Sequence, residues 1–242
     1  MKWLKSLFSR RKKTAEAPAE YYSAEEINVI ESHITKHFGQ FDNVFHEIIS
    51  PDIHVDIVII KPTDERDYYT LITMGMGAHR MNVPPELVGY KFDRAEMMIC
   101  LPPDWKLPGV TPDGVDGADE NDPDSFAHEN WYWPIRWLKN LARLPIWNNT
   151  WISIGHTVPN GPDAEPFAEN TKLGCMIVVP PFQFSEDAVL CEMPDGSVVS
   201  FYQMFPLYAD EMNFKLANDF DTLMEKFEEL PEAVDINRQN IL

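Results

Sequence analysis

The sequence predicts an α+β fold in which a mixed or mostly antiparallel sheet is flanked by helices. Strand-like segments occur in runs joined by short turns, and the helical segments do not alternate with them as crossover connections would. The predicted order is helix, three strands, helix, four strands, helix. The chain has 242 residues, of which 44% are hydrophobic, so it is long and apolar enough to form one large domain or two small ones.

The first half begins with a helix predicted over residues 23–38. Ser23 and Glu26 form a capping box, isoleucines follow at helical spacing, and Gly39 provides a stop. The first strand after it is rich in Val and Ile on both faces, which is typical of a central strand. The three strands are expected over residues 54–61, 68–75 and 95–101.

Residues 103–130 change in composition to Pro, Gly, Asp and Asn, and no Lys or Arg follows Lys106 within them. A loop of this length is uncommon inside a compact domain and is often functional or disordered. We therefore predict a partner-binding surface on this acidic loop. Its carboxylates are Asp113, Asp116, Asp119, Glu120, Asp122, Asp124 and Glu129.

The second half opens with a helix predicted to begin at Trp133 and Pro134 and to end at Pro145, with a basic stripe on its outer face. A tight turn over residues 194–196 joins the last two strands as a hairpin. A long amphipathic helical region is expected over residues 212–230, where Pro231 ends it. The four strands between these helices are expected over residues 150–158, 173–179, 188–193 and 198–205.

The charge of the chain narrows the choice of partners. There are 39 Asp and Glu against 20 Lys and Arg, which gives a net charge of −19 and argues against nucleic acid as a partner. Six basic residues and no acidic ones lie before Thr14, together with an apolar set that shares one helical face. This pattern predicts weak contact with a membrane surface through residues 1–13, or simply a solvated tail. No signal peptide or membrane span is expected.

Cysteine usage favours a reducing compartment. The three residues Cys100, Cys175 and Cys191 are an odd number without C-x-x-C spacing, so neither a disulfide framework nor a zinc site is encoded. Cys100 and Cys175 lie in apolar strands, where a thiol acts as a small hydrophobe, and we expect both to be buried. The sequence thus predicts a cytoplasmic protein that needs no cofactor.

Few residues offer catalytic chemistry. His54 and Asp56 share a strand face and could form an acid–base pair, but the sequence supplies no third ligand, and we predict a structural pair and no metal site. Ser153 and His156 should point to opposite faces of a strand, which breaks a triad. No catalytic residue is therefore assigned. The alternative is an enzyme that uses His54, Asp56 or His156 in a cleft.

Five segments resemble, in order, the bacterial branch of the Suppressor of fused family. The likeness extends over about residues 21–230 and implies a binding domain without known catalytic residues. In animals, the family's protein holds the tail of a Gli transcription factor as a strand between two domains, and similar bacterial domains are associated with immunity proteins that neutralise toxins. The segments cover residues 62–84, 94–105, 133–145, 149–161 and 165–181.

Together these observations predict a basic tail and linker over residues 1–20, a Suppressor of fused-like domain over 21–232 and a C-terminal tail over 233–242. The second half of the animal protein, which closes the groove, has no room after residue 230. We expect a non-catalytic inhibitor or immunity-type protein that sequesters a partner protein, such as a basic toxin domain. The alternatives are the enzyme described above and a membrane-surface adaptor.

Overall fold

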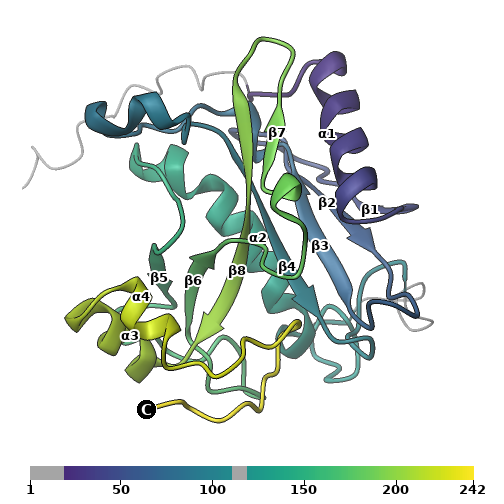
Figure 1. Ribbon diagram of the computed structural model, residues 1–242. Helices are drawn as coiled ribbons and strands as arrows, with labels where there is room; N and C mark the ends of the chain where they lie inside the picture. Colours follow the sequence, from purple (N-terminus) through teal and green to yellow (C-terminus); the bar gives the residue numbers. More distant parts are fainter. Residues whose placement is uncertain (1–18, 111–118) are drawn as a thin grey trace, which may run out of the picture.

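The computed structural model describes residues 19–110 and 119–242, and within them the chain forms an eight-stranded sheet with helices on both faces (Figure 1). The strand order is β1-β2-β3-β4-β8-β6-β5, and β7 pairs with part of β8. All pairs are antiparallel except β4 with β8. The strands are β1 (Asn43–Phe45), β2 (Asp56–Ile60), β3 (Tyr69–Met74), β4 (Ala95–Leu101), β5 (Thr157–Pro159), β6 (Cys175–Val179), β7 (Leu190–Glu192) and β8 (Val198–Leu207). This confirms the α+β class and the mostly antiparallel sheet.

Two helices cover opposite faces of the sheet (Figure 1). The capping box predicted for the first helix is present, because Ser23 accepts from Glu26 N–H and the Glu26 side chain accepts from Ser23 N–H. The helices are α1 (Ala24–His37), α2 (Glu129–Asn148), α3 (Ala209–Ala217) and α4 (Phe220–Met224), with short 3-10 turns η1 (Met76–Ala78), η2 (Pro85–Tyr90) and η4 (Glu186–Ala188).

Side-chain alternation along the strands fills a core on each face. In β2, Ile57 and Ile59 face α2, whereas Val58 and Ile60 face α1, and all four are buried. A third cluster packs one face of β6 and the C-terminal end of β8 against α3 and α4. The first predicted strand, β2, is buried on both faces as expected. It is not central, however, but second from the edge of the sheet, because β1 pairs with its outer side.

Three predictions about elements were wrong. Of residues 150–158 only the last two belong to β5, because the chain turns at Gly155, where φ is +83°. The helix predicted from Trp133 to Pro145 begins at Glu129, where His128 caps it, and continues past Pro145. The C-terminal helical region breaks into α3 and α4 at Asn218, and β1 is a strand that the pattern did not reveal.

A buried carboxylate ties β4 to the neighbouring turn. Glu96 is fully buried and accepts hydrogen bonds from Tyr22 Oη (2.7 Å), Thr73 Oγ1 (2.6 Å) and the backbone N–H groups of Gly75 and Gly77. Burial raises the pKa of Glu96 above its ordinary value, and the hydrogen bonds oppose that rise.

The cysteines are free and buried, as expected for Cys100 and Cys175. Burial raises the pKa of each of these two thiols to about 12, and that of Cys191 to about 11. Within the described residues, no helix has the length and apolar character needed to cross a membrane. The membrane contact predicted for residues 1–13 lies outside the residues that the structure describes.

The last ten residues, predicted to be a C-terminal tail, pack on the domain. Val234 is buried, and its N–H donates to the carbonyl of Cys100 at the end of β4. Arg238 forms a two-pronged ion pair with Glu211 of α3, which is fully buried, and the guanidinium lies over aromatic rings at the end of β8. The limits of 21 and 232 for an independent domain remain a prediction.

Candidate protein-binding surface

The described part of the acidic loop leads directly into α2. Asp119, Glu120, Asp122 and Asp124 are exposed, and Glu129 opens the helix, whereas Asp113 and Asp116 lie outside the described residues. The loop is anchored at Ser125, which is buried three residues before His128, the N-cap of α2, and accepts from the His128 N–H.

Short side-chain to backbone hydrogen bonds shape this loop. Asp119 Oδ1 accepts from Asn121 N–H at 2.9 Å, and Asp122 Oδ1 accepts from Asp124 N–H at 2.9 Å, so each aspartate closes a local turn. The bond from Asn121 lowers the pKa of Asp119, and the bond from Lys106 lowers the pKa of Asp124. Both carboxyl groups are therefore ionised at neutral pH.

Two carboxylates of the loop already have cation partners. Lys106 Nζ lies 2.8 Å from Asp124 Oδ1 and also over the ring of Trp131, and Arg136 of α2 pairs with Glu129. In the part of the chain that the structure describes, Asp119, Glu120 and Asp122 have no ion-pair partner. The described binding residues thus fall into two groups. Asp124 and Glu129 are neutralised by cations, whereas Asp119, Glu120 and Asp122 are not, and we call these three the acidic tip.

A hollow of about 610 Å³ lies between this acidic tip and the first turns of α2. Burial raises the pKa of Tyr132, so its hydroxyl stays protonated there and can act as a hydrogen-bond donor. A rigid helix with an acidic loop above a hollow suits the docking of a basic protein surface. The lining residues are Asp119, Glu120, Asn121, Ala127, Glu129, Tyr132 and Arg136.

The structure brings together only two of the three residues of the enzyme alternative. His54 Nε2 lies 3.2 Å from Asp56 Oδ1 at the start of β2. His156 lies just before β5, at the other end of the sheet, where it packs edge-on against Trp151. Among the described residues, no group of three or more His, Cys, Asp and Glu side chains is arranged to hold a metal ion.

The pair is part of a larger network. His46 Nδ1 lies 2.9 Å from Asp56 Oδ2, Glu47 N–H donates to Asp56 Oδ1, and Ser50 Oγ lies 2.7 Å from His54 Nδ1. Ser153, by contrast, turns its hydroxyl toward Tyr202 rather than toward His156. His54 and Asp56 thus contact each other and are both tied into this network, while their assignment as a structural pair remains a prediction.

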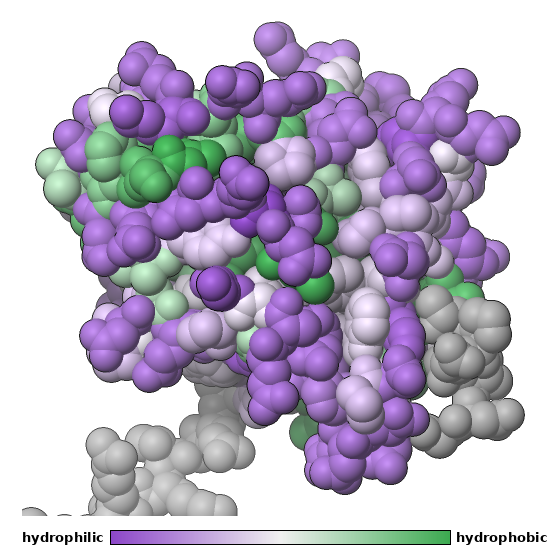
Figure 2. All heavy atoms as spheres, turned by 90° about the horizontal axis from the view of Figure 1, so that it is seen from below, coloured by the Kyte–Doolittle hydropathy of each residue, from purple (hydrophilic) through white to green (hydrophobic). Residues whose placement is uncertain are grey.

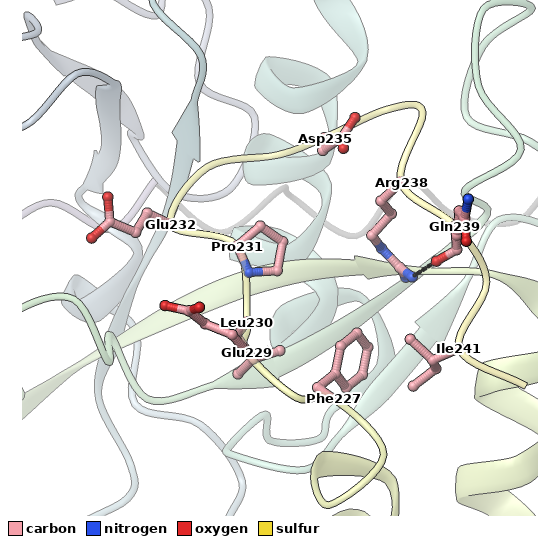
Figure 3. Close-up of a pocket in the computed structure, with 9 residues that line it drawn as sticks. All are labelled: Phe227, Glu229, Leu230, Pro231, Glu232, Asp235, Arg238, Gln239 and Ile241. Carbon is pink, nitrogen blue, oxygen red and sulfur yellow. Dashed lines mark hydrogen bonds between the residues drawn. The ribbon is translucent and has the colours of Figure 1, made fainter.

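The C-terminal segment forms a second cavity, of about 510 Å³, that sequence reasoning missed (Figure 3). Its wall combines apolar side chains, among them Phe227 and Ile241, with the exposed carboxylates of Glu229, Glu232 and Asp235. Arg238 extends from the yellow C-terminal chain among them, and Glu211 already neutralises it. The sequence held a signal for this packing, which is the recurrence of apolar residues in the tail at Val234, Ile236 and Ile241.

Hydrophilic side chains dominate the face seen in Figure 2, and hydrophobic residues occupy only smaller areas between them. This distribution fits the excess of acidic residues in the sequence.

Comparison with protein families decides what kind of protein this is, because the model of the Suppressor of fused protein (SUFU) family matches residues 51–239. The chain belongs to the SUFU family. The resemblance inferred from the five sequence segments is thereby confirmed. An uncharacterized protein of Ureaplasma parvum serovar 3, UU111, is 26% identical over 225 residues, which cover 91% of this chain and 98% of that protein.

Solved structures of SUFU proteins share the fold. A SUFU homologue from Neisseria gonorrhoeae has a TM-score of 0.58 and 19% identity, with 91% of this chain and 98% of that chain covered. A chain of the Sufu–Fu complex has a TM-score of 0.58 and 12% identity, with coverages of 90% and 92%. Drosophila Suppressor of Fused has a TM-score of 0.51 and 12% identity, and the match covers 89% of this chain but only 50% of that one.

Proposed function

We propose that this SUFU-family protein is a non-catalytic binding domain that sequesters a partner protein, as an inhibitor or immunity-type protein does. A SUFU relative with the same fold is found in a complex with a second protein, Fu, which supports a binding role. The three free and buried cysteines support a reducing compartment, so the proposal places this binding in the cytoplasm.

The acidic tip of the loop carries the proposal. Asp119, Glu120 and Asp122 are exposed and lack a cation partner among the described residues, and the first two line the hollow beside α2. A body with net charge −19 adds a long-range field of the same sign. The partner that fits this surface is a basic protein, such as a toxin domain, and we propose that Asp113 and Asp116 extend the same surface.

The test is a variant that carries Asp119→Asn, Glu120→Gln and Asp122→Asn, examined against a basic partner recovered by affinity capture. The control variant carries Asp221→Asn, Glu225→Gln and Glu228→Gln, which removes the same charge from exposed positions in and after α4. Surface charges act mainly on diffusional encounter, so the loop variant should associate more slowly, with a flatter salt dependence, and dissociate at a similar rate.

The control variant should keep most of the association rate, because its charges are remote from the docking surface. Equal association rates and salt slopes for the loop variant and the parent would contradict a role for the loop. Recognition would then move to a sheet edge, where β1 and β5 are the outermost strands of the described sheet.

A further inference from the structure

The loop between β1 and β2, residues 46–55, is held in place by a buried arginine. Arg143 of α2 is 5% exposed, and its guanidinium donates to Glu47 Oε1 (2.5 Å), Asp52 Oδ1 (2.9 Å) and the carbonyl of Ile53 (3.1 Å). A planar guanidinium with several donors fixes the positions of all its acceptors at once. Both ends of the loop are therefore attached to α2.

A second set of contacts holds the middle of the loop. Ser50 Oγ bonds to Glu47 Oε2 (2.9 Å) and lies 2.7 Å from His54 Nδ1, while Val55 N–H donates to Glu47 Oε2. Asp56, at the start of β2, binds the backbone N–H of Glu47. These bonds leave the two residues between Glu47 and Ser50 at the tip of a preorganised loop.

Those two residues are isoleucines with almost no cover. Ile48 is 96% exposed and Ile49 is 79% exposed. Trp147 and Tyr21, both more than half exposed, lie close to the same loop, because Trp147 Nε1 donates to Asp52 Oδ2 and the Tyr21 ring stacks on His54. We name these four side chains the apolar patch. Exposed apolar side chains at the tip of a preorganised loop, with exposed aromatic rings bound to the same loop, mark an interaction surface.

The chain itself supplies a segment that matches this patch in position. Glu20 N–H donates to the carbonyl of Asp52, and His54 N–H donates to the carbonyl of Glu20, so the chain enters the described structure beside the patch. Residues 14–19 lie between this point and residue 13, and six residues span at most about 20 Å. A tether this short gives residues 1–13 an effective concentration on the order of 1 mM at the patch.

The same segment matches the surroundings of the patch in chemistry. Residues 14–242 contain 14 Lys and Arg against 39 Asp and Glu, a net charge of −25, and Glu20 and Glu25 flank the Tyr21 side of the patch along the chain. The segment is amphipathic, with apolar residues for the patch and basic residues for the acidic rim. Its apolar members are Trp3, Leu4, Leu7 and Phe8, and its basic members are Lys2, Lys5, Arg10, Arg11, Lys12 and Lys13.

We propose that the apolar patch around Ile48 and Ile49 is the docking site for the chain's own residues 1–13. The charge of the rest of the chain favours this occupant over an anionic bilayer, because a net charge of −25 repels such a surface and attracts a segment with six cations and no acid. The proposal is independent of the acidic loop and of the partner proposed for it.

Trypsin cleavage of the full chain tests the docking, since trypsin cuts after Lys and Arg and four such residues stand at positions 10–13. We expect cleavage there to be about tenfold slower in the parent than in an Ile48→Asp, Ile49→Asp variant. Raising the salt from about 50 to about 500 mM should speed cleavage of the parent and leave the variant nearly unchanged.

The control variant is Val88→Asp, Leu190→Asp, which adds the same two charges at exposed apolar positions elsewhere and should be cut as slowly as the parent. A reciprocal variant, Leu4→Asp, Leu7→Asp, alters only the segment and should be cut as fast as the Ile48, Ile49 variant. Combining both pairs should give no further increase, because one contact is lost in either case.

Equal cleavage rates in the parent and in both docking variants would overturn the proposal. It would also be overturned if the Ile48, Ile49 substitutions abolished co-sedimentation of the parent with phosphatidylserine vesicles without changing the cleavage rate, since the patch would then serve a bilayer. A dimer of the parent that these substitutions dissociate at an unchanged cleavage rate would assign the patch to a second copy instead.

Discussion

Glu96 shows, at the scale of one residue, how a buried charge can serve the fold. Its carboxylate accepts from two hydroxyls and two backbone N–H groups, so the N–H groups of Gly75 and Gly77 in the turn after β3 both find an acceptor. Removing the acceptor leaves those donors buried and unpaired, which costs about 1–3 kcal/mol for each group. The carboxylate is therefore a structural requirement of this turn.

We predict that Glu96→Leu is strongly destabilising, by about 3–5 kcal/mol, whereas Glu96→Gln is mild. The glutamine carbonyl can keep the bonds from Tyr22 and the two glycines, and its amide can donate to Thr73 Oγ1. Urea unfolding at neutral pH measures both changes. A Gln variant as unstable as the Leu variant would show that the charge itself is needed.

The difference in stability between the parent protein and the Glu96→Gln variant should depend on pH. Burial raises the pKa of Glu96, so the folded state binds its proton more tightly than the unfolded state. The stability that this provides is complete below the ordinary glutamate pKa and is lost as the pH rises through the raised value. Glu96→Gln has no such proton, so its stability relative to the parent should improve as the pH rises above the ordinary glutamate pKa.

The cysteines give a second prediction at this scale. With a pKa of about 12, Cys100 and Cys175 are thiolates in only about one molecule in ten thousand at pH 8, and Cys191 is also buried. An aromatic disulfide reagent should therefore release no thiolate chromophore from the native protein within minutes and three equivalents in urea. Rapid reaction of any one thiol before unfolding would contradict the packing around it.

At the scale of elements, the sequence was most informative where local and tertiary signals agree. The capping box set the start of α1, and the apolar run over residues 95–101 coincides with β4. The β1 strand was missed because three half-exposed residues carry no periodicity. The break between α3 and α4 was missed because apolar spacing continues across Asn218 while its backbone leaves the helical region.

The candidate site was predictable in part for a similar reason. Acidic residues without basic neighbours in sequence marked the loop, but the sequence could not show that Lys106 and Arg136 fold back onto two of them. The contact between Arg136 and Glu129 depends on α2 beginning at Glu129, and that boundary was predicted four residues too late. The apolar patch gave no sequence signal at all, because Ile48 and Ile49 look like ordinary core residues until the fold leaves them outside.

The C-terminal segment is a structural element without regular secondary structure, and Arg238 fixes it. Arg238→Gln should cost about 3–5 kcal/mol, because Glu211 remains fully buried without its cation. The double variant Glu211→Gln, Arg238→Gln should recover part of that loss, since no unpaired charge is left. Urea unfolding of the parent, both single variants and the double variant measures the coupling, and strictly additive losses would contradict a direct ion pair.

At the scale of the whole molecule, the excess of negative charge sets how stability responds to salt. Exposed ion pairs such as Arg80–Asp195 weaken as salt rises, but each contributes little to the stability. With 39 acidic against 20 basic residues, repulsion between like charges outweighs them, and screening relieves it. The Debye length falls from about 30 Å at 0.01 M to about 8 Å at 0.15 M, so the repulsion between most exposed carboxylates is screened at the higher ionic strength.

We therefore predict that the melting temperature at pH 7 rises when sodium chloride is increased from about 0.01 to about 0.15 M. A relief of about 1 kcal/mol corresponds to a rise of about 2–4 °C in a domain of this size. Sodium fluoride at the same ionic strength should give the same shift, because screening depends on ionic strength and not on the anion. A fall in melting temperature would contradict this prediction. It would mean that attraction within the native ion pairs outweighs the repulsion between like charges, despite the net charge of −19.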